Sequence, residues 1–353
     1  MKSIIHIVGN RPQFIKLAVL HRELAQSALF FQKIVHTGQH FSYEMSELFF
    51  GELNIPPADI NFDINNLSTA RFIGTAADQL EQYFINAGHS IVLVYGDTNT
   101  TLAAAMAAKR ANCLLVHFES GVRTGDNTMP EEINRIITDR LADINLCCTA
   151  RNFATMQAEG YGSSIKSGVY LTGDLMLDAF NKLGNNINKK IVPEKNYVAC
   201  TIHRSANINN RNNLHQIIDA LNEINTTLPV IFPVHPNTKK MMEKFDCRPA
   251  FKILEPHGYS AMKSLLAGAD FVITDSGGTC RESYFLKKPT LIIMDKPFWP
   301  EIIAHNCALS CAAGKEGIIN NFYSLADLKG DFSTAIFGDG NAAAKIREVL
   351  QEI

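Results

Sequence analysis

The sequence lacks the motifs of two large nucleotide-binding classes and has no membrane-spanning run. It contains no GxGxxG motif, so NAD or FAD binding has no fingerprint, and no GxxxxGK(S/T) loop, so ATP hydrolysis is not expected. No stretch approaches the roughly 18 apolar residues that a membrane helix needs. The first apolar run is broken by His6 and Gly9, and no small-residue cleavage site follows it. A buried strand is therefore expected there. Neither a signal peptide nor membrane association is expected.

A strong charge of one sign and paired cysteines are missing as well. The 33 basic and 35 acidic residues leave a formal net charge of -2, so no broad nucleic-acid surface is expected. The eight cysteines form no CxxC pair, which argues against a zinc site or a disulfide framework. Free thiols fit a reducing compartment, so a cytoplasmic protein without a metal or other cofactor is expected.

What the sequence does contain is a regular alternation of short apolar runs and amphipathic stretches. Its 353 residues are enough for two α/β cores, and 46% of them are hydrophobic. Continuous apolar strands that alternate with helices are typical of parallel sheets covered on both faces. The predicted strands are residues 4–8, 33–36, 91–95, 114–118, 144–147, 197–202, 230–234, 251–254, 271–274 and 290–293. The predicted helices are residues 12–25, 69–87, 100–111, 131–141, 213–224, 237–245, 261–267, 279–286 and 341–353.

The alternation is interrupted once, at residues 181–196, which are rich in Asn and Lys and poor in apolar side chains. We therefore predict an α/β fold with two doubly wound Rossmann-like domains facing a cleft. The N-terminal domain is residues 1–180, completed by the C-terminal helix within residues 335–353, and the C-terminal domain is residues 181–334. Ligands of such sheets bind at the carboxyl ends of the strands, so the residues there are the candidates for function.

A basic pair follows the first predicted strand. Arg11 lies where a ligand anion would meet a helix N-terminus, and Pro12 suits the first turn of that helix. Lys16, about one turn later, adds a second positive charge. The alternative is a solvated arginine in a loop, but the position directly after a buried strand favours a phosphate site.

Three carboxylates lie near strand ends of the same predicted sheet. Asp97 and Glu119 follow two different strands, and Glu131 begins a helix. Carboxylates that converge on one cleft are the composition of an acid/base site. Taken singly, Asp97 can be a helix N-cap and Glu131 a first-turn acid.

The strongest local pattern in the second half is TDSGGT, directly before a helix. Gly277 and Gly278 allow the backbone to approach a ligand closely, and Ser276 precedes them at the helix start, whose free N–H groups favour an anion. Glu282, about one turn inside the helix, is placed to accept hydrogen bonds from ribose hydroxyls. A plain turn is the alternative. Two histidines, His203 and His235, also follow predicted strands of this half.

Taken together, several motifs of the chain resemble those of one known enzyme family. GNRPQFIKLA resembles the GTRPEIIKLAP opening of the non-hydrolysing UDP-N-acetylglucosamine 2-epimerases, and HTGQH, YGDTNTT, HFESGVRTGD, PEEINR, TIHR and TDSGGTCRE follow in the family's order over nearly the whole chain. The resemblance implies the GT-B fold, a UDP-sugar substrate, a homodimer and a role in surface-polysaccharide precursor synthesis. It also implies a reaction that inverts C2 by eliminating UDP to a glycal and adding it back.

The resemblance also implies roles for individual residues. It suggests that the N-terminal domain holds the sugar and the C-terminal domain holds UDP. The implied catalytic residues are Asp97, Glu119, Glu131 and His203. The implied UDP-binding residues are Arg11, Ser276, Gly277, Gly278 and Glu282, with Lys16 added from its position. Gln39 and His235 match a second site or the cleft, where some relatives bind an activating substrate molecule.

Some positions depart from the family pattern. HRREN reads HRSAN here, SGGIQEE reads SGGTCRE with Cys280 and Arg281, and RDTTERPE reads MDKPFWPE over residues 294–301. The segment HTGQHFSYEMSELFF is closer to relatives that act on diacetamido-uronic acid nucleotides. The primary hypothesis is a UDP-N-acetylglucosamine 2-epimerase. Its substrate is expected to be UDP-N-acetylglucosamine or a modified UDP-N-acetylamino sugar. The alternatives are a diacetamido-uronate 2-epimerase, a GT-B glycosyltransferase, a hydrolysing epimerase and a non-catalytic UDP-sugar binding protein.

Overall fold

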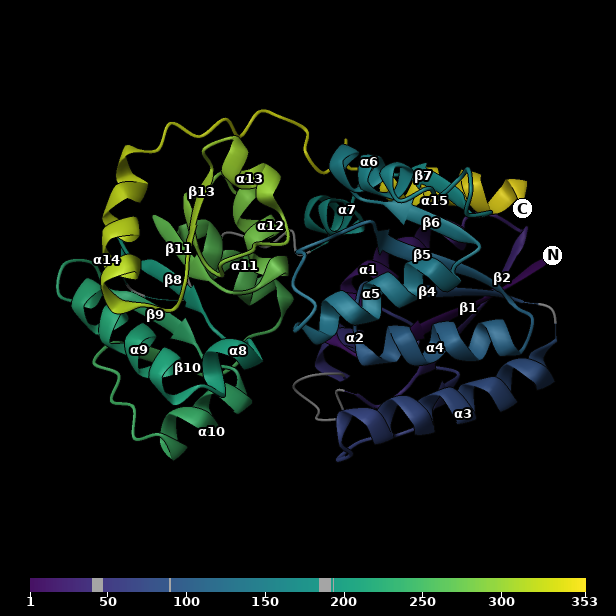
Figure 1. The fold of residues 1–353 in the computed structure, drawn as a ribbon, viewed down its shortest axis with the longest axis horizontal. Helices are drawn as coiled ribbons and strands as arrows, with labels where there is room; N and C mark the ends of the chain where they lie inside the picture. Colours follow the sequence, from purple (N-terminus) through teal and green to yellow (C-terminus); the bar gives the residue numbers. More distant parts are fainter. Residues whose placement is uncertain (40–46, 89, 184–191, 193) are drawn as a thin grey trace. The chain divides into compact units, whose positions relative to one another are not determined.

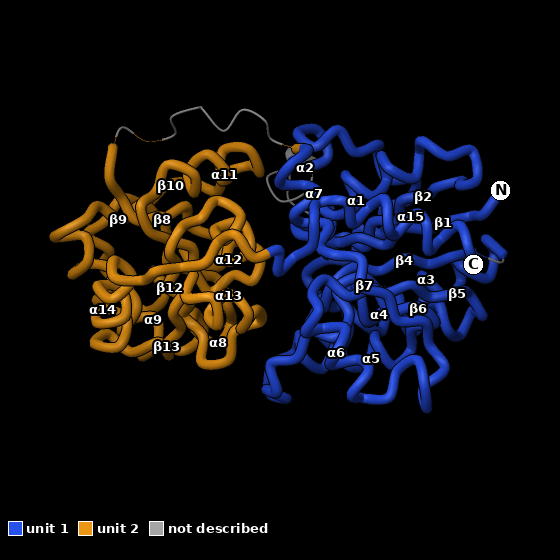
Figure 2. Tube along the Cα trace, turned by 90° about the horizontal axis from the view of Figure 1, so that it is seen from above, with its two compact units in different colours: residues 1–182, 335–353 blue, residues 183–334 orange. Residues whose placement is uncertain are grey.

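The chain folds into two compact units in a computed structural model that describes residues 1–39, 47–88, 90–183, 192 and 194–353 (Figure 1). Unit 1 comprises Met1–Lys182 and Ala335–Ile353, and unit 2 comprises Leu183–Thr334 (Figure 2). The chain thus leaves unit 1 after residue 182, where the sequence predicts a boundary after residue 180. Most of the predicted linker, residues 181–196, lies outside the described residues.

Unit 1 is built on a parallel sheet whose order, among the described residues, is β3-β2-β1-β4-β5-β6-β7. The strand order reverses between β1 and β4, and in such sheets a ligand is expected at the carboxyl ends of the strands that flank this point. The strands are β1 Lys2–Val8, β2 Phe30–His36, β3 Ile60–Asn61, β4 Ile91–Tyr95, β5 Leu114–Ser120, β6 Ile144–Cys147 and β7 Gly168–Leu171. The helices are α1 Arg11–Leu24, α2 Glu47–Glu52, α3 Thr69–Ala87, α4 Asn99–Arg110, α5 Pro130–Leu141, α6 Ala150–Ala158, α7 Leu175–Lys182 and α15 Ala342–Glu352.

Unit 2 repeats this architecture with the order β10-β9-β8-β11-β12-β13 in the described part of the chain, all parallel. Its order reverses between β8 and β11. The strands are β8 Val198–Thr201, β9 Val230–Pro233, β10 Lys252–Leu254, β11 Phe271–Thr274, β12 Thr290–Ile293 and β13 Ala308–Cys311. The helices are α8 Ser205–Ile208, α9 Arg211–Asn225, α10 Pro236–Lys244, α11 Tyr259–Gly268, α12 Gly277–Phe285, α13 Pro300–Ala304 and α14 Lys315–Ser324, followed by the short 3-10 helix η2 Leu325–Asp327.

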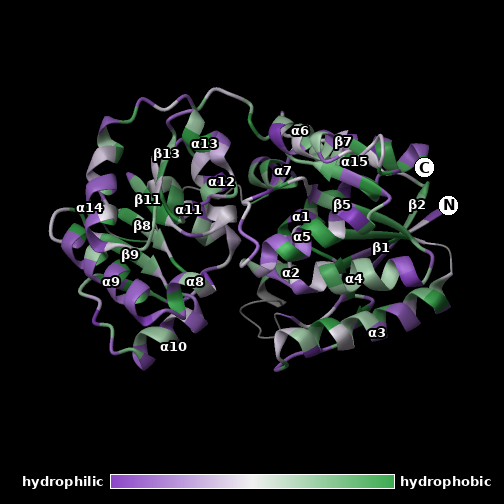
Figure 3. Cartoon of the chain, in the orientation of Figure 1, coloured by the Kyte–Doolittle hydropathy of each residue, from purple (hydrophilic) through white to green (hydrophobic). Residues whose placement is uncertain are grey.

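Hydropathy explains why these segments form these layers. The strands are coloured mainly as hydrophobic in Figure 3, whereas helices such as α3 and α9 carry both colours. In α3 the buried side chains are Phe72, Ala76, Leu80 and Phe84, four residues apart, so a single stripe of the helix faces the sheet. The predicted class of two doubly wound α/β domains is confirmed. Within the described residues, no helix is both long and apolar enough to span a membrane.

The last helix, α15, belongs to unit 1 although it follows unit 2 in the sequence. The buried carboxylate of Asp178 in α7 accepts hydrogen bonds from the backbone N–H groups of Ala342 (2.9 Å) and Ala343 (3.0 Å) at the start of α15. A carboxylate at a helix N-terminus also favours the helix dipole. Further along α15, Arg347 pairs with Glu23 of α1 at 2.8 Å. These contacts attach α15 to α7 and α1 of unit 1.

Candidate active site

Gln13 fixes the loops at the switch point of unit 1. Its Oε1 accepts a hydrogen bond from the Gly9 N–H (2.8 Å), and its Nε2 donates to the Tyr95 carbonyl (2.9 Å) and to the hydroxyl of Thr98 (3.0 Å). The side chain is buried, and it joins the loop after β1 to the loop after β4. Arg11, the first residue of α1, therefore starts from a fixed backbone, with its guanidinium carbon 4.6 Å from the Phe49 ring centroid.

Lys16 and Glu119 form a buried ion pair. Lys16 lies in α1 and its ammonium contacts the Glu119 carboxylate at the end of β5. Glu119 has φ +76°, and the β5–β6 register shifts at this point, between Phe118 and Ser120. A non-glycine residue in the left-handed region costs about 1 kcal/mol or more, and such strain is concentrated at functional sites. Lys16 was predicted from the sequence to face an anionic ligand; in the structure its ammonium pairs with Glu119.

Asp97 is held by a second cation. Its carboxylate pairs with Arg135 of α5, and Arg135 also contacts Glu132 at 2.6 Å. The N-cap of α4 is Thr98, whose hydroxyl accepts from the Thr101 N–H, so the alternative that Asp97 is the N-cap is wrong. Asp97 and Glu119 thus follow the neighbouring strands β4 and β5, each beside its own cation.

Two adjacent glutamates begin α5 and have different surroundings. Glu131 is half-buried, whereas Glu132 is fully buried and accepts hydrogen bonds from the N–H groups of Thr124 and Gly125, both 2.9 Å. Burial alone would raise the pKa of Glu132, but these backbone hydrogen bonds and the charge of Arg135 outweigh it, so the pKa is lowered. Glu132 therefore stays ionised and holds the loop before α5.

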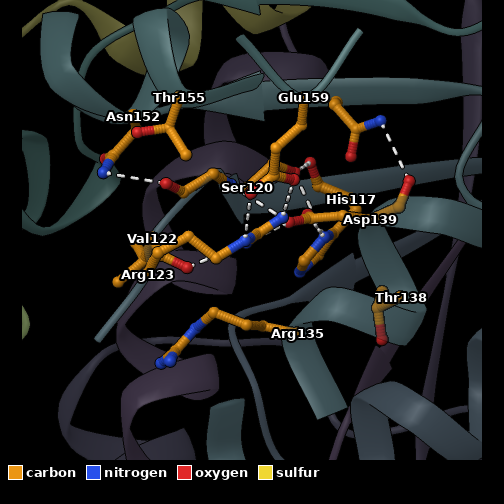
Figure 4. A network of polar contacts seen from close by, with 12 residues as sticks. His117, Ser120, Val122, Arg123, Arg135, Thr138, Asp139, Asn152, Thr155 and Glu159 are labelled. Atoms are coloured by element: carbon orange, nitrogen blue, oxygen red, sulfur yellow. Dashed lines mark hydrogen bonds and ion pairs between the residues drawn. The ribbon is translucent and has the colours of Figure 1, made fainter. Parts of the chain in front are cut away.

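A buried network behind these carboxylates was not predicted from the sequence. It joins His117 of β5, Asp139 of α5, Arg123 and Glu159 (Figure 4). A signal was present: residues 132, 135 and 139 are spaced i, i+3 and i+7, so α5 has a charged stripe on one face. That this stripe is buried against β5 is a tertiary fact that spacing alone does not contain.

In unit 2, the buried carboxylate of Asp275 organises the loop after β8. It accepts hydrogen bonds from the N–H groups of His203 (3.0 Å) and Arg204 (2.9 Å) and from the Asn207 side-chain amide (2.9 Å). His203 Nδ1 lies 3.6 Å from the same carboxylate, while the imidazole remains 40% exposed. The ring centroids of His203 and His235 are 6.1 Å apart, so the two predicted histidines lie together.

The SGG turn forms the N-terminus of α12. Ser276 is the N-cap and accepts a hydrogen bond from the Thr279 N–H at 3.3 Å. A Cβ added to Gly277 would lie 3.1 Å from the Phe298 ring, whereas one added to Gly278 meets nothing closer than 3.7 Å. The Trp299 indole N–H donates to the Gly277 carbonyl at 3.1 Å, so Gly277 is packed under aromatic side chains and Gly278 is open.

The residues that depart from the family pattern contact one another. The guanidinium of Arg204 lies 4.2 Å from the Phe298 ring centroid, and that of Arg281 lies 4.7 Å from the Trp299 ring centroid. Such arginine–aromatic pairs are cation–π contacts. The predicted ribose ligand Glu282 is buried, and its charge partly offsets the burial that lowers the pKa of Lys263.

Gln39 is the last described residue before residues 40–46. Its Oε1 accepts hydrogen bonds from the N–H (3.2 Å) and the hydroxyl (2.9 Å) of Thr100, at the start of α4. The rest of the predicted HTGQHFSYEMSELFF segment up to residue 46 lies outside the described residues. No group of three or more His, Cys, Asp or Glu side chains in the described part of the chain is arranged to hold a metal ion.

Comparisons with known proteins identify the family of the chain. The profile of the UDP-N-acetylglucosamine 2-epimerase family matches residues 22–351. A UDP-N-acetylglucosamine 2-epimerase homolog of Methanococcus maripaludis is 36% identical, with 99% of this chain and 100% of the relative covered. A UDP-2,3-diacetamido-2,3-dideoxy-D-glucuronate 2-epimerase of Pseudomonas aeruginosa is 33% identical, with the same coverage. The crystal structure of Methanocaldococcus jannaschii UDP-GlcNAc 2-epimerase in complex with UDP-GlcNAc and UDP superimposes with a TM-score of 0.93 at 29% identity, and the match covers 100% of both chains.

The family profile and the relatives cover nearly the whole chain, including both halves of the predicted site. The order of motifs seen in the sequence is therefore that of homologous proteins. The chain belongs to the UDP-N-acetylglucosamine 2-epimerase family.

Proposed function

We propose that this enzyme of nucleotide-sugar metabolism is a non-hydrolysing UDP-N-acetylglucosamine 2-epimerase that interconverts UDP-GlcNAc and UDP-ManNAc. The observation that carries the proposal is the pair of carboxylates on neighbouring strands of unit 1, Glu119 beside Lys16 and Asp97 beside Arg135. Each ion pair holds its carboxylate in place at the strand end where the proton transfer is proposed. The Methanocaldococcus jannaschii relative, crystallised with UDP-GlcNAc and UDP, supports the choice of substrate.

In the proposed reaction, unit 2 binds the nucleotide. The N–H groups of Ser276, Gly277 and Gly278 and the dipole of α12 hold the diphosphate, Arg11 adds a positive charge, and Glu282 accepts hydrogen bonds from the ribose. These groups stabilise the negative charge that develops as UDP departs from C1.

The sugar chemistry is proposed to take place at unit 1. The C2–H bond is weakly acidic, so its cleavage is coupled to the loss of UDP. The C2–H electron pair forms the C1=C2 bond of a glycal, the proton goes to an enzyme base, and UDP leaves with the C1–O pair. Re-addition of UDP at C1 with protonation of C2 on the opposite face gives the epimer. Asp97, Glu119, Glu131 and His203 are the groups proposed to move these protons or to orient the ring.

We also propose that the protein is a cytoplasmic homodimer in surface-polysaccharide precursor synthesis, with a second, regulatory site that includes Gln39 and His235. The homodimer is supported by α5, which exposes Ile133, Ile136 and Ile137 at helical spacing, and by α4, which packs on α5 and exposes Met106. A second copy of the chain would cover this apolar strip. The cysteines are all free thiols, which fits a reducing compartment.

A second candidate is the 2-epimerisation of a diacetamido-uronic acid nucleotide. The Pseudomonas aeruginosa relative favours it, as do Arg281 and the aromatic residues that replace the family's usual polar side chains in unit 2. A uronate carries one more carboxylate than UDP-GlcNAc, and Arg281 places a guanidinium where the family pattern has a glutamate, which suits an additional anion.

The decisive test is proton NMR of the purified protein with UDP-GlcNAc in heavy water. The expected result is UDP-ManNAc with deuterium at C2 and UDP still attached. Asp97→Asn and Glu119→Gln are expected to abolish turnover while circular dichroism stays unchanged; wild-type turnover in both would remove their catalytic roles. Transfer at C1 without exchange at C2 would indicate a glycosyltransferase instead. Exchange only with the diacetamido-uronate substrate would select the second candidate.

A further inference from the structure

A fully buried histidine joins the two proposed carboxylate positions. His117 of β5 has Nδ1 2.8 Å from Asp139 Oδ1 and Nε2 2.7 Å from the carbonyl oxygen of Gly96, and neither ring nor carboxylate is exposed. Figure 4 shows His117 and Asp139 side by side, with the Arg123 side chain reaching Asp139 and Glu159. No step of the proposed reaction uses this cluster, so its role needs a separate explanation.

The partners of His117 determine where its protons are. A carbonyl oxygen only accepts hydrogen bonds, so Nε2 must carry a proton. The Asp139 carboxylate also accepts from Arg123 Nη1 (2.7 Å) and the Gly121 N–H (3.2 Å). Burial alone would raise the pKa of Asp139, but the hydrogen bonds and charges of His117 and Arg123 outweigh it and lower the pKa. Asp139 is therefore ionised, and the His117 ring is held at both nitrogens, by Asp139 at Nδ1 and by the Gly96 carbonyl at Nε2.

The remaining titratable groups around the cluster are either neutral or paired. Burial and the nearby Asp139 raise the pKa of Cys147 on β6 and raise that of Tyr161 to about 12, so both stay neutral. Glu159 of the turn after α6 pairs with Arg123 at 2.8 Å. The buried Asp139 carboxylate is thus compensated by Arg123, which in turn pairs with Glu159.

His117 acts on the active site through Gly96. The N–H of Gly96 donates to the Phe118 carbonyl (2.9 Å), and the Gly96 carbonyl accepts from His117. Residues of β5 therefore hold Gly96 through both of its backbone groups. Gly96 has φ +67° and directly precedes Asp97, while Glu119 is two residues after His117 on β5. The same strand therefore sets the positions of both carboxylates.

We propose that His117 is a positioning residue: its ring, bonded to Asp139 at Nδ1 and to the Gly96 carbonyl at Nε2, fixes the turn of residues 96–97 against β5 and so sets the spacing of Asp97 and Glu119 for proton transfer at C2. This inference rests on the proposed epimerase function. Proton transfer requires a separation accurate to a fraction of an ångström, and a misplacement of about 1 Å costs roughly 100-fold in rate.

Two amide substitutions test the two hydrogen bonds of the ring one at a time, because each keeps one bond and removes the other. The amide nitrogen of His117→Gln takes the place of Nε2 and keeps the Gly96 bond, whereas that of His117→Asn takes the place of Nδ1 and keeps the Asp139 bond. Both remove the imidazole ring and keep one of its two hydrogen bonds, so each is the other's control. We expect His117→Asn to lower kcat and C2 deuterium uptake about 100-fold with KM changed less than about threefold, and His117→Gln to stay within about tenfold of wild type.

Equal losses in the two variants, or a loss confined to KM, would overturn the positioning role. A second measurement uses the wild-type enzyme, so it does not depend on variants that fold. Nitrogen NMR with labelled histidine is expected to show one ring whose Nε2 proton exchanges slowly with solvent, because that proton lies in the buried bond to the Gly96 carbonyl; no such proton would overturn the inference. A wild-type enzyme that takes up no deuterium at C2 would instead count against the proposed function, and the ring measurement would still report on His117.

Discussion

The adjacent residues Glu131 and Glu132 differ in role: Glu132 holds the loop before α5, and Glu131 is proposed to take part in catalysis. Substitution distinguishes these roles. We expect Glu132→Gln to destabilise the protein by about 3 kcal/mol near pH 7, because it removes a buried anion beside Arg135 and weakens the bonds to Thr124 and Gly125. Urea denaturation measures the loss. The isosteric Glu131→Gln in half-buried surroundings is the control, with a smaller loss of stability but a loss of turnover. A larger loss of stability in Glu131→Gln would reverse the assignment.

The same residue gives a pH dependence whose sign is fixed by its lowered pKa. Because the folded-state pKa of Glu132 lies below the usual 4.5, the unfolded chain binds a proton first as the pH falls. The stability that Glu132 contributes is present above about pH 4.5 and is lost as the pH falls through the folded-state value. We expect the stability difference between wild type and Glu132→Gln to shrink below pH 4.5. A difference that stays constant down to acid unfolding would contradict this linkage.

At the scale of elements, the start of α12 offers a matched pair of substitutions. Gly277→Ala places a methyl group 3.1 Å from the Phe298 ring, so we expect unit 2 to be destabilised by about 1–3 kcal/mol. Gly278→Ala has room, and alanine favours a helix, so its stability is expected to be unchanged or slightly higher. If the diphosphate approaches Gly278 as proposed, this variant still weakens UDP binding in calorimetry. Normal UDP affinity in Gly278→Ala would argue against that approach.

The elements also show what sequence could and could not predict. Strands 91–95, 144–147, 271–274 and 290–293 have the predicted bounds because they are mostly apolar and almost entirely buried. The edge strands β3, β7 and β13 were missed, since they are short and only partly buried, and so are barely distinguishable from loops. In the site, residues directly after strands were found because chain position alone identifies them. Their partners Arg135, His117 and Asp275 were not assigned these tasks, because their contacts join segments far apart in the sequence.

At the scale of the molecule, the two units have separate hydrophobic cores. We therefore expect differential scanning calorimetry to resolve two transitions. UDP at about 100 times its Kd stabilises the state that binds it by roughly 2.7 kcal/mol, so it should raise the transition of unit 2 more than that of unit 1. Hydrogen exchange assigns the transitions to the units. A shift confined to unit 1 would contradict the proposed division of labour between nucleotide and sugar.

The proposed homodimer has a direct test on the exposed strip of α5. Ile133→Lys with Ile137→Lys places two charges in the strip, and light scattering is expected to change from the mass of a dimer to that of a monomer. Lysine at Tyr323, an exposed aromatic residue of unit 2, is the control and should leave the dimer intact. A monomeric wild type, or a double variant that remains dimeric, would remove α5 from the interface.

The return of α15 to unit 1 has a consequence for synthesis on the ribosome. Residues 183–334 form one continuous stretch and have their own core, so unit 2 can fold as soon as it emerges. Unit 1 is translated first, but α15, which the Asp178 carboxylate caps, is translated last. The domain that starts first is therefore finished last, and a nascent chain that stalls after residue 334 carries a complete second domain beside an unfinished first one.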